Sequence, residues 1–302
     1  MLSSAFITVI IPVYNDAERL QICLQSLENQ TIPKQQYEIV VIDNNSSDDV
    51  QKVVQNFQQV SLGFEKQPGS YCARNKGISL ARGEVLAFTD SDCIPSPGWL
   101  EKGLQCLASV PDCGFVAGGI KFFFSNPGNP NPIELYDSLF YLQQKIYVEE
   151  RGWGATANLF TFKKVFDEVG LFNTTLKSGG DAEWGRRVSS NGYKAFYAED
   201  CYISHPARSS FKEIRKKIRR TLGGAHTISK TSQHDRVLEL FTPKDTLLTQ
   251  LRPPLRSAFR KSFKNQRLKN YHQKVTIFLM VFFFHYLRTF EMFQLRTEKL
   301  ST

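Results

Sequence analysis

FITVIIPVYND, at residues 6–16, is the stretch that decides the fold. Its first eight residues form an uninterrupted apolar run of strand length, which is typical of a strand covered on both faces. Asn15 and Asp16 follow this run and can cap a helix, whose apolar residues recur at helical spacing between Leu20 and Leu27. A buried strand followed by an amphipathic helix predicts the start of an open α/β sheet.

The same alternation continues along the chain. Further apolar runs predict strands at 37–42, 62–66 and 84–89, with helical patterns between them at 48–57 and 71–82. Beyond residue 110 the pattern loosens, and we expect strands at 114–124, 158–163 and 193–197, with helices at 133–148 and 181–190. Elements of these lengths in this order predict an α/β fold with a Rossmann-like, mostly parallel sheet flanked by helices.

The cysteines and the missing motifs exclude several classes of protein. The six cysteines are scattered and form no Cys-x-x-Cys pair, so we expect neither a zinc site nor a disulfide framework, and we expect a reducing, cytoplasmic compartment. No Gly-x-Gly-x-x-Gly follows the first strand, and the P-loop pattern Gly-x4-Gly-Lys-Ser/Thr does not occur. Dinucleotide oxidoreductases and P-loop enzymes are therefore disfavoured.

Polar residues follow three of the predicted strands, at the edge where open α/β sheets bind their ligands. They are Tyr14 and Asn15 after the first strand, Asp43 after the second, and Asp90 and Asp92 after the fourth. Asp43 can accept a hydrogen bond from a base or ribose, or it can simply start an Asx turn. Asp90 and Asp92 supply the oxygen ligands that a hard divalent cation prefers, and such a cation can bridge a diphosphate. Their convergence at one edge favours the functional interpretation.

Five motifs extend this pattern in order along the chain. They are VIIPVYND at 9–16, VVIDNNSSDD at 40–49, ARNKGISLARGE at 73–84, FTDSD at 88–92 and GDAEWGRRVSSNGY at 180–193. With these motifs the chain resembles, over residues 6–206, the family 2 inverting glycosyltransferases of the GT-A fold. The resemblance implies a metal-dependent enzyme that moves a sugar from a nucleoside diphosphate to an acceptor hydroxyl, in polysaccharide or glycoconjugate biosynthesis.

The resemblance also implies roles for individual residues. The residues that match nucleotide-sugar-binding positions are Pro12, Tyr14, Asn15, Asp43, Arg74 and Asp90. Asp43 matches the aspartate that binds the base, usually uracil, which implies a UDP-sugar donor. Asp92 and His205 match metal ligands, which implies Mn²⁺ or Mg²⁺ as the cofactor. The alternative for His205, which precedes Pro206, is an ordinary structural histidine.

The sequence gives weaker evidence for the residues that bind and activate the acceptor. Asp181 matches the general base of the family, but Gly180 stands where the family often has glutamate, and the alternative role for Asp181 is a helix N-cap. The residues that we assign to acceptor binding are Trp153, Gly180, Glu183 and Trp184, although both tryptophans suit core packing equally well. In the implied in-line displacement, Asp181 takes the proton of the acceptor hydroxyl while the metal stabilises the leaving diphosphate.

Processive members of the family carry a Gln-x-x-Arg-Trp motif, and this chain has no Arg-Trp dipeptide. We therefore expect transfer of a single sugar to a glycan or a lipid-linked acceptor. Two other functions stay open at this point. One is a sugar nucleotidyltransferase, which should show a glycine-rich phosphate loop near its N-terminus. The other is a non-catalytic nucleotide-sugar-binding protein with a membrane-binding tail.

Charge separates the chain into two parts. Residues 1–206 hold 17 Lys and Arg against 23 Asp and Glu, a balance of −6, whereas residues 207–302 hold 21 against 6, a balance of +15. We expect a glycosyltransferase domain over 1–206 and a basic helical extension over 207–302. Because the first part is acidic, we expect no nucleic-acid partner.

The extension contains two apolar patterns. Residues 211–222 predict a basic helix with an apolar stripe, which is typical of helices that lie on a membrane surface. The uncharged run 275–287 would span about 20 Å as a helix, too short for a bilayer core of about 30 Å. We expect the extension to hold the protein peripherally on the inner face of the cell membrane. The alternative is that both helices pack on the first domain and extend its core.

Overall fold

The computed structural model describes residues 5–231 and 251–298, and the chain forms two compact units. Unit 1 contains Met1–Phe123 and Leu142–Pro206, and unit 2 contains Phe124–Tyr141 and Ala207–Thr302. The segment 124–141 thus groups with the C-terminal part of the chain, although the sequence places it inside the range 1–206.

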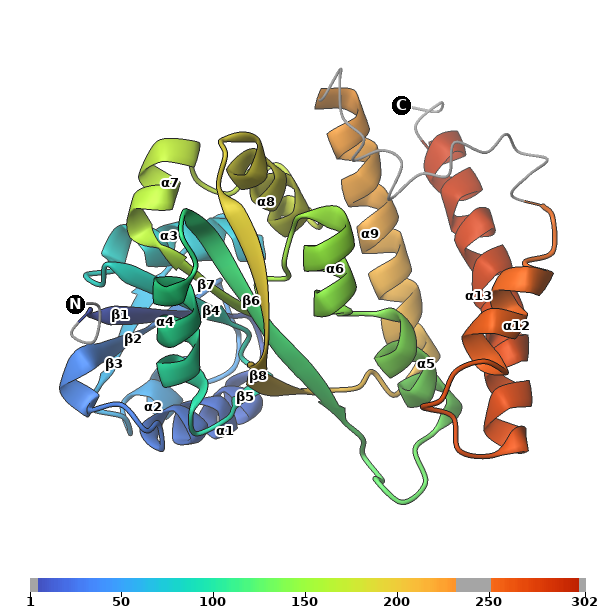
Figure 1. Ribbon diagram of the computed structural model, residues 1–302, viewed down its shortest axis with the longest axis horizontal. Coiled ribbons are helices and arrows are strands. Elements are labelled where there is room, and N and C mark those ends of the chain that lie inside the picture. Colours follow the sequence, from blue (N-terminus) through green and yellow to red (C-terminus); the bar gives the residue numbers. More distant parts are fainter. Residues whose placement is uncertain (1–4, 232–250, 299–302) are drawn as a thin grey trace. The chain divides into compact units, whose positions relative to one another are not determined.

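Unit 1 is built on one mixed sheet with the strand order β3-β2-β1-β4-β7-β6-β8-β5 (Figure 1). Its strands are β1 (Ile7–Val13), β2 (Tyr37–Asp43), β3 (Val60–Phe64), β4 (Val85–Thr89), β5 (Ile94–Pro95), β6 (Cys113–Phe123), β7 (Asn158–Phe162) and β8 (Lys194–Pro206). The strands β3, β2, β1 and β4 pair in parallel, as do β6 and β8, whereas β7 is antiparallel to β4 and β6. The predicted α/β fold is confirmed, with an antiparallel strand inside the sheet.

Helices cover both faces of the sheet. They are α1 (Ala17–Glu28), α2 (Val50–Val54), α3 (Ser70–Leu80), α4 (Trp99–Ser109), α6 (Gln144–Arg151), α7 (Lys163–Val169) and α8 (Gly180–Ser190), with a short 3-10 helix at Lys34–Gln36. Strand β1 shows the layering, because Ile7, Val9 and Ile11 belong to the core that includes α1 and α4, whereas Ile10 faces α3. A Cβ atom at Gly77 would overlap Ile10, so glycine lets α3 approach the strand closely.

Most predicted elements are present with small changes in their bounds. The predicted helix over 133–148 is in fact two helices, α5 (Pro132–Phe140) and α6, because the chain turns at Leu142, which has a φ of 50°. The last strand is much longer than predicted, since β8 pairs with β6 along most of its length. The helices α4 and α7 were not predicted.

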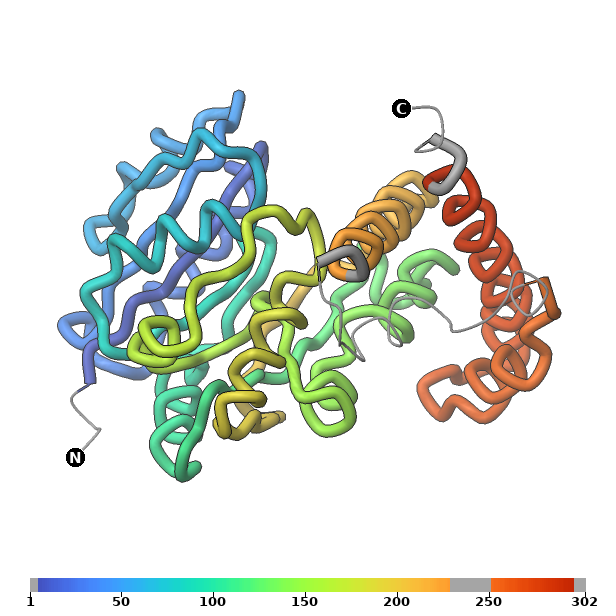
Figure 2. Tube along the Cα trace, turned by 90° about the horizontal axis from the view of Figure 1, so that it is seen from above, coloured from blue at the N-terminus to red at the C-terminus, as the bar shows by residue number. Residues whose placement is uncertain are grey.

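The described residues of unit 2 form α5, α9 (Phe211–Thr231), α12 (Leu255–Ser262) and α13 (Tyr271–Glu298), and α12 lies beside α13 (Figure 2). The apolar stripe of α9, which includes Ile214 and Ile218, is buried in a cluster with Phe284 of α13. The stripe therefore packs within unit 2. This corrects the expectation that it faces a membrane.

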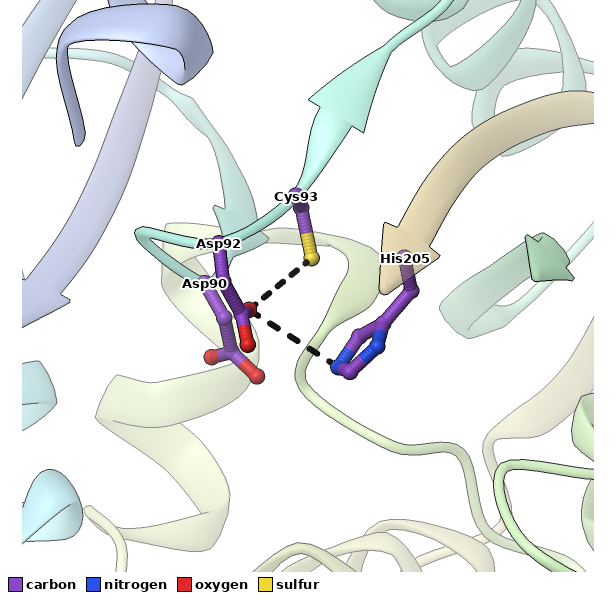
Figure 3. A group of neighbouring side chains, drawn as sticks. All are labelled: Asp90, Asp92, Cys93 and His205. Atoms are coloured by element: carbon purple, nitrogen blue, oxygen red, sulfur yellow. Dashed lines mark hydrogen bonds and ion pairs between the residues drawn. The ribbon is translucent and has the colours of Figure 1, made fainter. Parts of the chain in front are cut away.

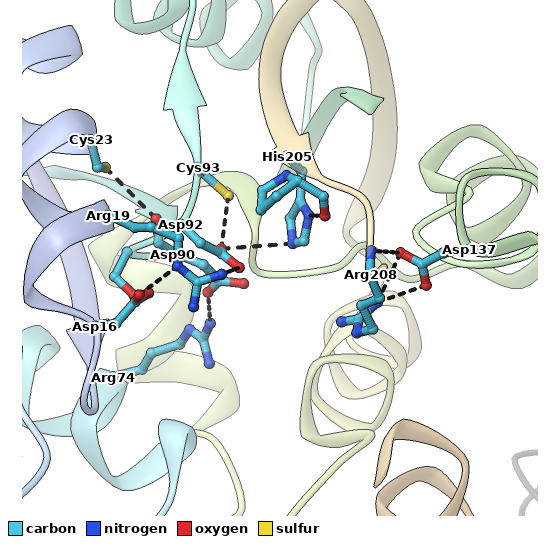
Figure 4. Close-up of polar contacts among 12 residues, drawn as sticks. Asp16, Arg19, Cys23, Arg74, Asp90, Asp92, Cys93, Asp137, His205 and Arg208 are labelled. Carbon is cyan, nitrogen blue, oxygen red and sulfur yellow. Dashed lines mark hydrogen bonds and ion pairs between the residues drawn. The ribbon is translucent and has the colours of Figure 1, made fainter. Parts of the chain in front are cut away.

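Unit 2 also contains buried carboxylates that are paired with arginines. Asp137 is fully buried and accepts hydrogen bonds from the backbone and guanidinium of Arg208, at 3.0 and 2.9 Å (Figure 4). Glu291, also fully buried, contacts Arg215 at 2.5 Å and Arg219 at 3.3 Å. Basic residues of the extension thus neutralise acidic side chains inside unit 2.

The helix α13 is longer than the uncharged run that marks it in the sequence. Its segment Tyr271–Leu295 has 25 residues and is long and apolar enough to cross a membrane, by length and composition alone. At about 1.5 Å per residue it extends about 38 Å, which exceeds a bilayer core of about 30 Å. The uncharged run 275–287 alone is too short, as predicted, but the helix continues beyond it at both ends.

Candidate active site

The predicted nucleotide-binding residues of β1 and β2 lie at the C-terminal edge of the sheet. Pro12 is inside β1, where it pairs with Ile42 of β2, and Tyr14 follows the strand with 63% of its surface exposed. Asp43 ends β2 and accepts a hydrogen bond from the backbone N–H of Ser46 at 2.9 Å. This local bond reaches the N–H three residues on, one further than the Asx turn considered from the sequence, and it uses one of the two carboxylate oxygens of Asp43.

The loops after β1 and β2 are fastened to each other. Asn15, with a φ of 51°, accepts a hydrogen bond from the N–H of Ser47 at 2.7 Å through its side chain. Asp48 accepts one from the N–H of Ala17, the first residue of α1, also at 2.7 Å. Asp16 occupies the predicted N-cap position of α1, but its side chain makes no capping hydrogen bond, and a carboxylate from the second loop accepts the first N–H of the helix instead.

The loop after β4 is tied to helix α3. Arg74 of α3 is buried, and its guanidinium contacts Asp90 at 2.5 Å (Figure 4). The ring of Tyr71, one helical turn earlier, lies 5.8 Å from the centre of the same guanidinium. Arg74 thus neutralises one carboxylate of the Asp90-x-Asp92 motif and fixes its direction.

Asp90, Asp92, Cys93 and His205 bring their ligand atoms within 4.8 Å of one another (Figure 3). Asp92 Oδ1 lies 3.7 Å from His205 Nε2 and 3.8 Å from the thiol of Cys93. His205 comes from β8, more than a hundred residues further along the chain, and is buried against the ring of Phe122. The parallel pairing of β6 with β8 holds it in place.

The tautomer of His205 follows from its neighbours. Its Nδ1 lies 2.7 Å from the carbonyl oxygen of Pro206, and because a carbonyl only accepts, Nδ1 carries the proton. In the neutral ring the lone pair of Nε2 then faces Asp92, an arrangement that suits a bound cation. Burial raises the pKa of the Cys93 thiol well above its usual value. The imidazole of His205 and the two carboxylates make up a nitrogen and oxygen ligand set. Such a set suits Mn²⁺ or Mg²⁺.

Two residues of this edge were missed by the sequence reasoning. Asp16 accepts hydrogen bonds from Arg19 at 2.5 Å and from the hydroxyl of Ser91 at 2.7 Å, and Arg19 also lies 3.8 Å from Asp92 (Figure 4). Burial raises the pKa of Asp16. The spacing of Asp16 and Arg19 in the first turn of α1 predicts a local ion pair, but nothing in the sequence shows that the pair reaches the loop after β4.

Asp181 lies in the first turn of α8, whose N-cap is Gly179 with a φ of 83°. Its Oδ1 accepts a hydrogen bond from the hydroxyl of Tyr71 at 3.1 Å, and its backbone N–H donates to the same hydroxyl at 3.3 Å. The alternative role of Asp181 as the N-cap is therefore wrong. A Cβ atom at Gly180 would come within 2.7 Å of the Tyr71 ring, so this ring fills the space that a larger residue at 180 would need.

The four predicted acceptor residues are not equally available. Trp184 is fully buried, stacks on Phe166 at 4.5 Å and donates its indole N–H to the carbonyl of Gly170, so its assignment to acceptor binding is corrected to core packing. Glu183 pairs with Arg187 at 2.7 Å, one turn along α8. Only 7% of Trp153 is exposed, and it stacks on Tyr147 at 4.1 Å.

The sequence is similar to those of known proteins. The family model "Glycosyl transferase family 2" matches residues 8–178. The chain belongs to this family. It is 38% identical to glycosyltransferase AglE of Haloferax volcanii over 219 residues, which cover 71% of each chain. It is 24% identical, over 70% of each chain, to a dolichyl N-acetyl-α-D-glucosaminyl phosphate 3-β-D-2,3-diacetamido-2,3-dideoxy-β-D-glucuronosyltransferase of Methanococcus voltae. The protein is therefore a glycosyltransferase.

Solved structures of glycosyltransferases share the fold. The mannosyltransferase PcManGT from Pyrobaculum calidifontis, in complex with GDP-Man and Mn²⁺, has a TM-score of 0.64 with 18% identity, covering 94% of this chain and 85% of its own. Residues 1–349 of TarS from S. aureus, in complex with UDP, have a TM-score of 0.53 with 18% identity, covering 78% and 70%. The predicted GT-A fold is confirmed.

Proposed function

We propose that this glycosyltransferase moves one sugar from a nucleoside diphosphate to an acceptor hydroxyl, with inversion at the anomeric carbon and with a divalent cation. The observation that carries the proposal is the group of ligand atoms from Asp90, Asp92 and His205 at the C-terminal edge of the sheet, on the same unit as Asp181. Two of the similar solved structures support a nucleotide-sugar donor, because one is a complex with GDP-Man and the other a complex with UDP. The Mn²⁺ in the first of these complexes supports a metal cofactor.

The residues present fit a divalent cation. Asp92 and His205 would hold it, with Asp90 contributing a carboxylate that Arg74 already orients. When bound, the cation supplies positive charge to the diphosphate leaving group. Pro12, Tyr14, Asn15 and Asp43 line the edge where the nucleoside would lie, and the exposed ring of Tyr14 is free to stack on a base.

Asp181 would act as the general base. Its Oδ1 is held by Tyr71, whereas its Oδ2 accepts no hydrogen bond from the residues that the structure describes. An oxygen in this state is suited to take the proton of an acceptor hydroxyl as that hydroxyl attacks the anomeric carbon. Trp153 and Tyr147, stacked on each other, would border the acceptor side.

For the acceptor we favour a lipid-linked glycan at a membrane surface. The relative from Methanococcus voltae is named for a dolichyl phosphate-linked sugar acceptor. In unit 2 the exposed apolar side chains of α12 and α13 include Leu255, Phe259, Leu279, Phe283 and Phe290. Basic residues such as Arg256 and Arg260 accompany them on α12, a combination that favours binding to anionic lipid. On this proposal residues 1–206 supply the catalytic domain and residues 207–302 supply membrane attachment.

The first test is a donor screen. Thermal unfolding of the full chain would be followed with UDP-glucose, UDP-N-acetylglucosamine, UDP-glucuronic acid and GDP-mannose, each with Mn²⁺, with Mg²⁺ and with EDTA. We expect one donor to raise the unfolding temperature with a divalent cation only, because binding to the native state stabilises it. The variant Asp92→Asn should lose this stabilisation. Equal stabilisation in EDTA would contradict the metal site.

A further inference from the structure

Tyr71 is a buried tyrosine at the start of α3, and none of the motifs that identify the family assigns it a role. Its hydroxyl donates to Oδ1 of Asp181 and accepts the backbone N–H of the same residue. The two residues are 110 positions apart in the sequence. Burial raises the pKa of the Tyr71 hydroxyl, so the hydroxyl keeps its proton and acts as a donor to the carboxylate.

The ring of Tyr71 is held from three sides. It lies against Phe172 with 5.7 Å between ring centroids, under the guanidinium of Arg74, and close to Gly180. Any side chain at position 180 would press on the ring, because a Cβ there comes within 2.7 Å of it. Gly180, the departure from the glutamate common in the family, is thus sterically matched to Tyr71.

The same residues connect the two halves of the candidate site. Asp90 contacts Arg74, the Arg74 guanidinium lies over the ring of Tyr71, and the Tyr71 hydroxyl holds Asp181. Arg74 and Tyr71, which stand between the two carboxylates, are both buried, which strengthens the polar contacts that they make.

We propose that Tyr71 is a positioning residue for catalysis. It fixes Oδ1 of Asp181, which leaves Oδ2 directed to the acceptor, and it does so from the helix whose Arg74 orients Asp90. The glycine at 180 is required because the tyrosine ring occupies the adjacent space. This inference rests on the proposed role of Asp181 as the base.

The test uses the variant Tyr71→Phe in the full chain. It removes only the hydroxyl and keeps the ring against Phe172 and Gly180. Release of nucleoside diphosphate would be measured with Mn²⁺ and with the donor that gives the fastest release among the four of the screen, water serving as the acceptor. We expect kcat to fall about 10- to 100-fold, because a small misplacement of a catalytic group has effects of this size. The KM for the donor should change less than about twofold, since the hydroxyl does not contact the nucleotide.

The matched control is Tyr37→Phe. Tyr37 is also buried and donates its hydroxyl to a backbone carbonyl, that of Leu27, at 2.8 Å. It begins β2, at the opposite end of that strand from Asp43. The free energy of unfolding of Tyr37→Phe should fall by about as much as that of Tyr71→Phe, whereas its kcat should stay at the wild-type value.

A double-mutant cycle separates positioning from general damage. In the Asp181→Asn background the hydroxyl has no base to position, so adding Tyr71→Phe should change kcat less than about twofold. If Tyr71→Phe unfolds the protein, Gly180→Ala tests the same point, because its methyl group would displace the ring and should lower kcat in the same way.

Two results would overturn the inference. The first is a wild-type kcat in Tyr71→Phe, or a loss of kcat on adding Tyr71→Phe that is equal in the wild-type and Asp181→Asn backgrounds. This result would remove Tyr71 from the mechanism and leave the proposed function intact. A wild-type protein that releases no nucleotide from any of the four donors would overturn the proposed function, and the inference with it.

Discussion

The variant Asp181→Asn separates the catalytic role of this residue from its structural one. Asparagine has the same shape, and its carbonyl oxygen can still accept the Tyr71 hydroxyl that holds Oδ1 at 3.1 Å. The new amide nitrogen replaces Oδ2 and cannot accept a proton. Loss of a general base lowers the rate by about 10²- to 10⁴-fold. At about 1.36 kcal/mol per factor of ten, this is about 2.7–5.4 kcal/mol of transition-state stabilisation.

The structural cost should be far smaller. Asp181 lies in the first turn of α8, where a negative charge stabilises the helix by about 0.3–1 kcal/mol. For a protein of this size that amounts to a change in Tm of no more than about 4 °C. Stability and turnover should therefore change by very different amounts.

The assay combines nucleotide release, donor binding and thermal unfolding on one preparation. Glu101→Gln is the matched control, because it removes a carboxylate from the first turn of another helix of unit 1, α4. Both variants should bind the donor and unfold within a few degrees of the wild type, but only Asp181→Asn should lose turnover. If Asp181→Asn retains turnover and loses only stability, the carboxylate serves the helix and the assignment of the base is wrong.

Three further predictions concern the two units. Glu38 is buried, which by itself raises its pKa, but hydrogen bonds from Arg82 and Thr8 outweigh burial and hold the pKa below its usual value. Its stabilising effect should thus be present at about pH 7 and lost as the pH falls through the folded pKa. Glu38→Gln should therefore cost about 1–3 kcal/mol in urea unfolding at pH 7 and progressively less as the pH falls through that pKa. Gly77→Ala should lower the free energy of unfolding by about 1–3 kcal/mol because its methyl group overlaps Ile10, whereas Gly223→Ala, in an open helical position, should not lower it. The wild type should float with anionic vesicles, and the double variant Leu279→Glu/Phe283→Glu should float less. The control Phe64→Glu, which changes an exposed apolar residue of unit 1, should float like the wild type. Equal flotation of all three proteins would contradict membrane attachment through α13.

The local pattern of the sequence predicts much of the fold. The apolar runs of β1, β2 and β4 are strands buried on both faces, and Leu20, Cys23, Leu24 and Leu27 are the buried residues of α1. These features depend on periodicity within a dozen residues, which the sequence displays directly. The placement of Asp43, Asp90 and Asp92 at one edge follows from the parallel arrangement of those strands.

Contacts between distant segments could not be predicted in this way. The hydrogen bond between Tyr71 and Asp181, and the contact between Asp48 and α1, depend on which loops meet in three dimensions. Trp184 shows the same limit. A tryptophan near the start of a helix can stack on a sugar ring or pack in the core, and only its contact with Phe166 in the folded chain shows that it packs in the core. The helix α13 extends beyond the uncharged run 275–287 because the charged residues that flank this run do not stop a helix.

The dependence of nucleotide release on Mn²⁺ tests the central claim most directly. The rate would be measured with the selected donor over a series of Mn²⁺ concentrations, for the wild type and for Asp92→Asn, whose side chain keeps its size and loses its charge. We expect the wild-type rate to rise to saturation with Mn²⁺ and to vanish in EDTA, and the variant to be at least about 100-fold slower at every concentration. Equal rates for the two proteins, or full activity in EDTA, would show that Asp92 does not hold a catalytic cation.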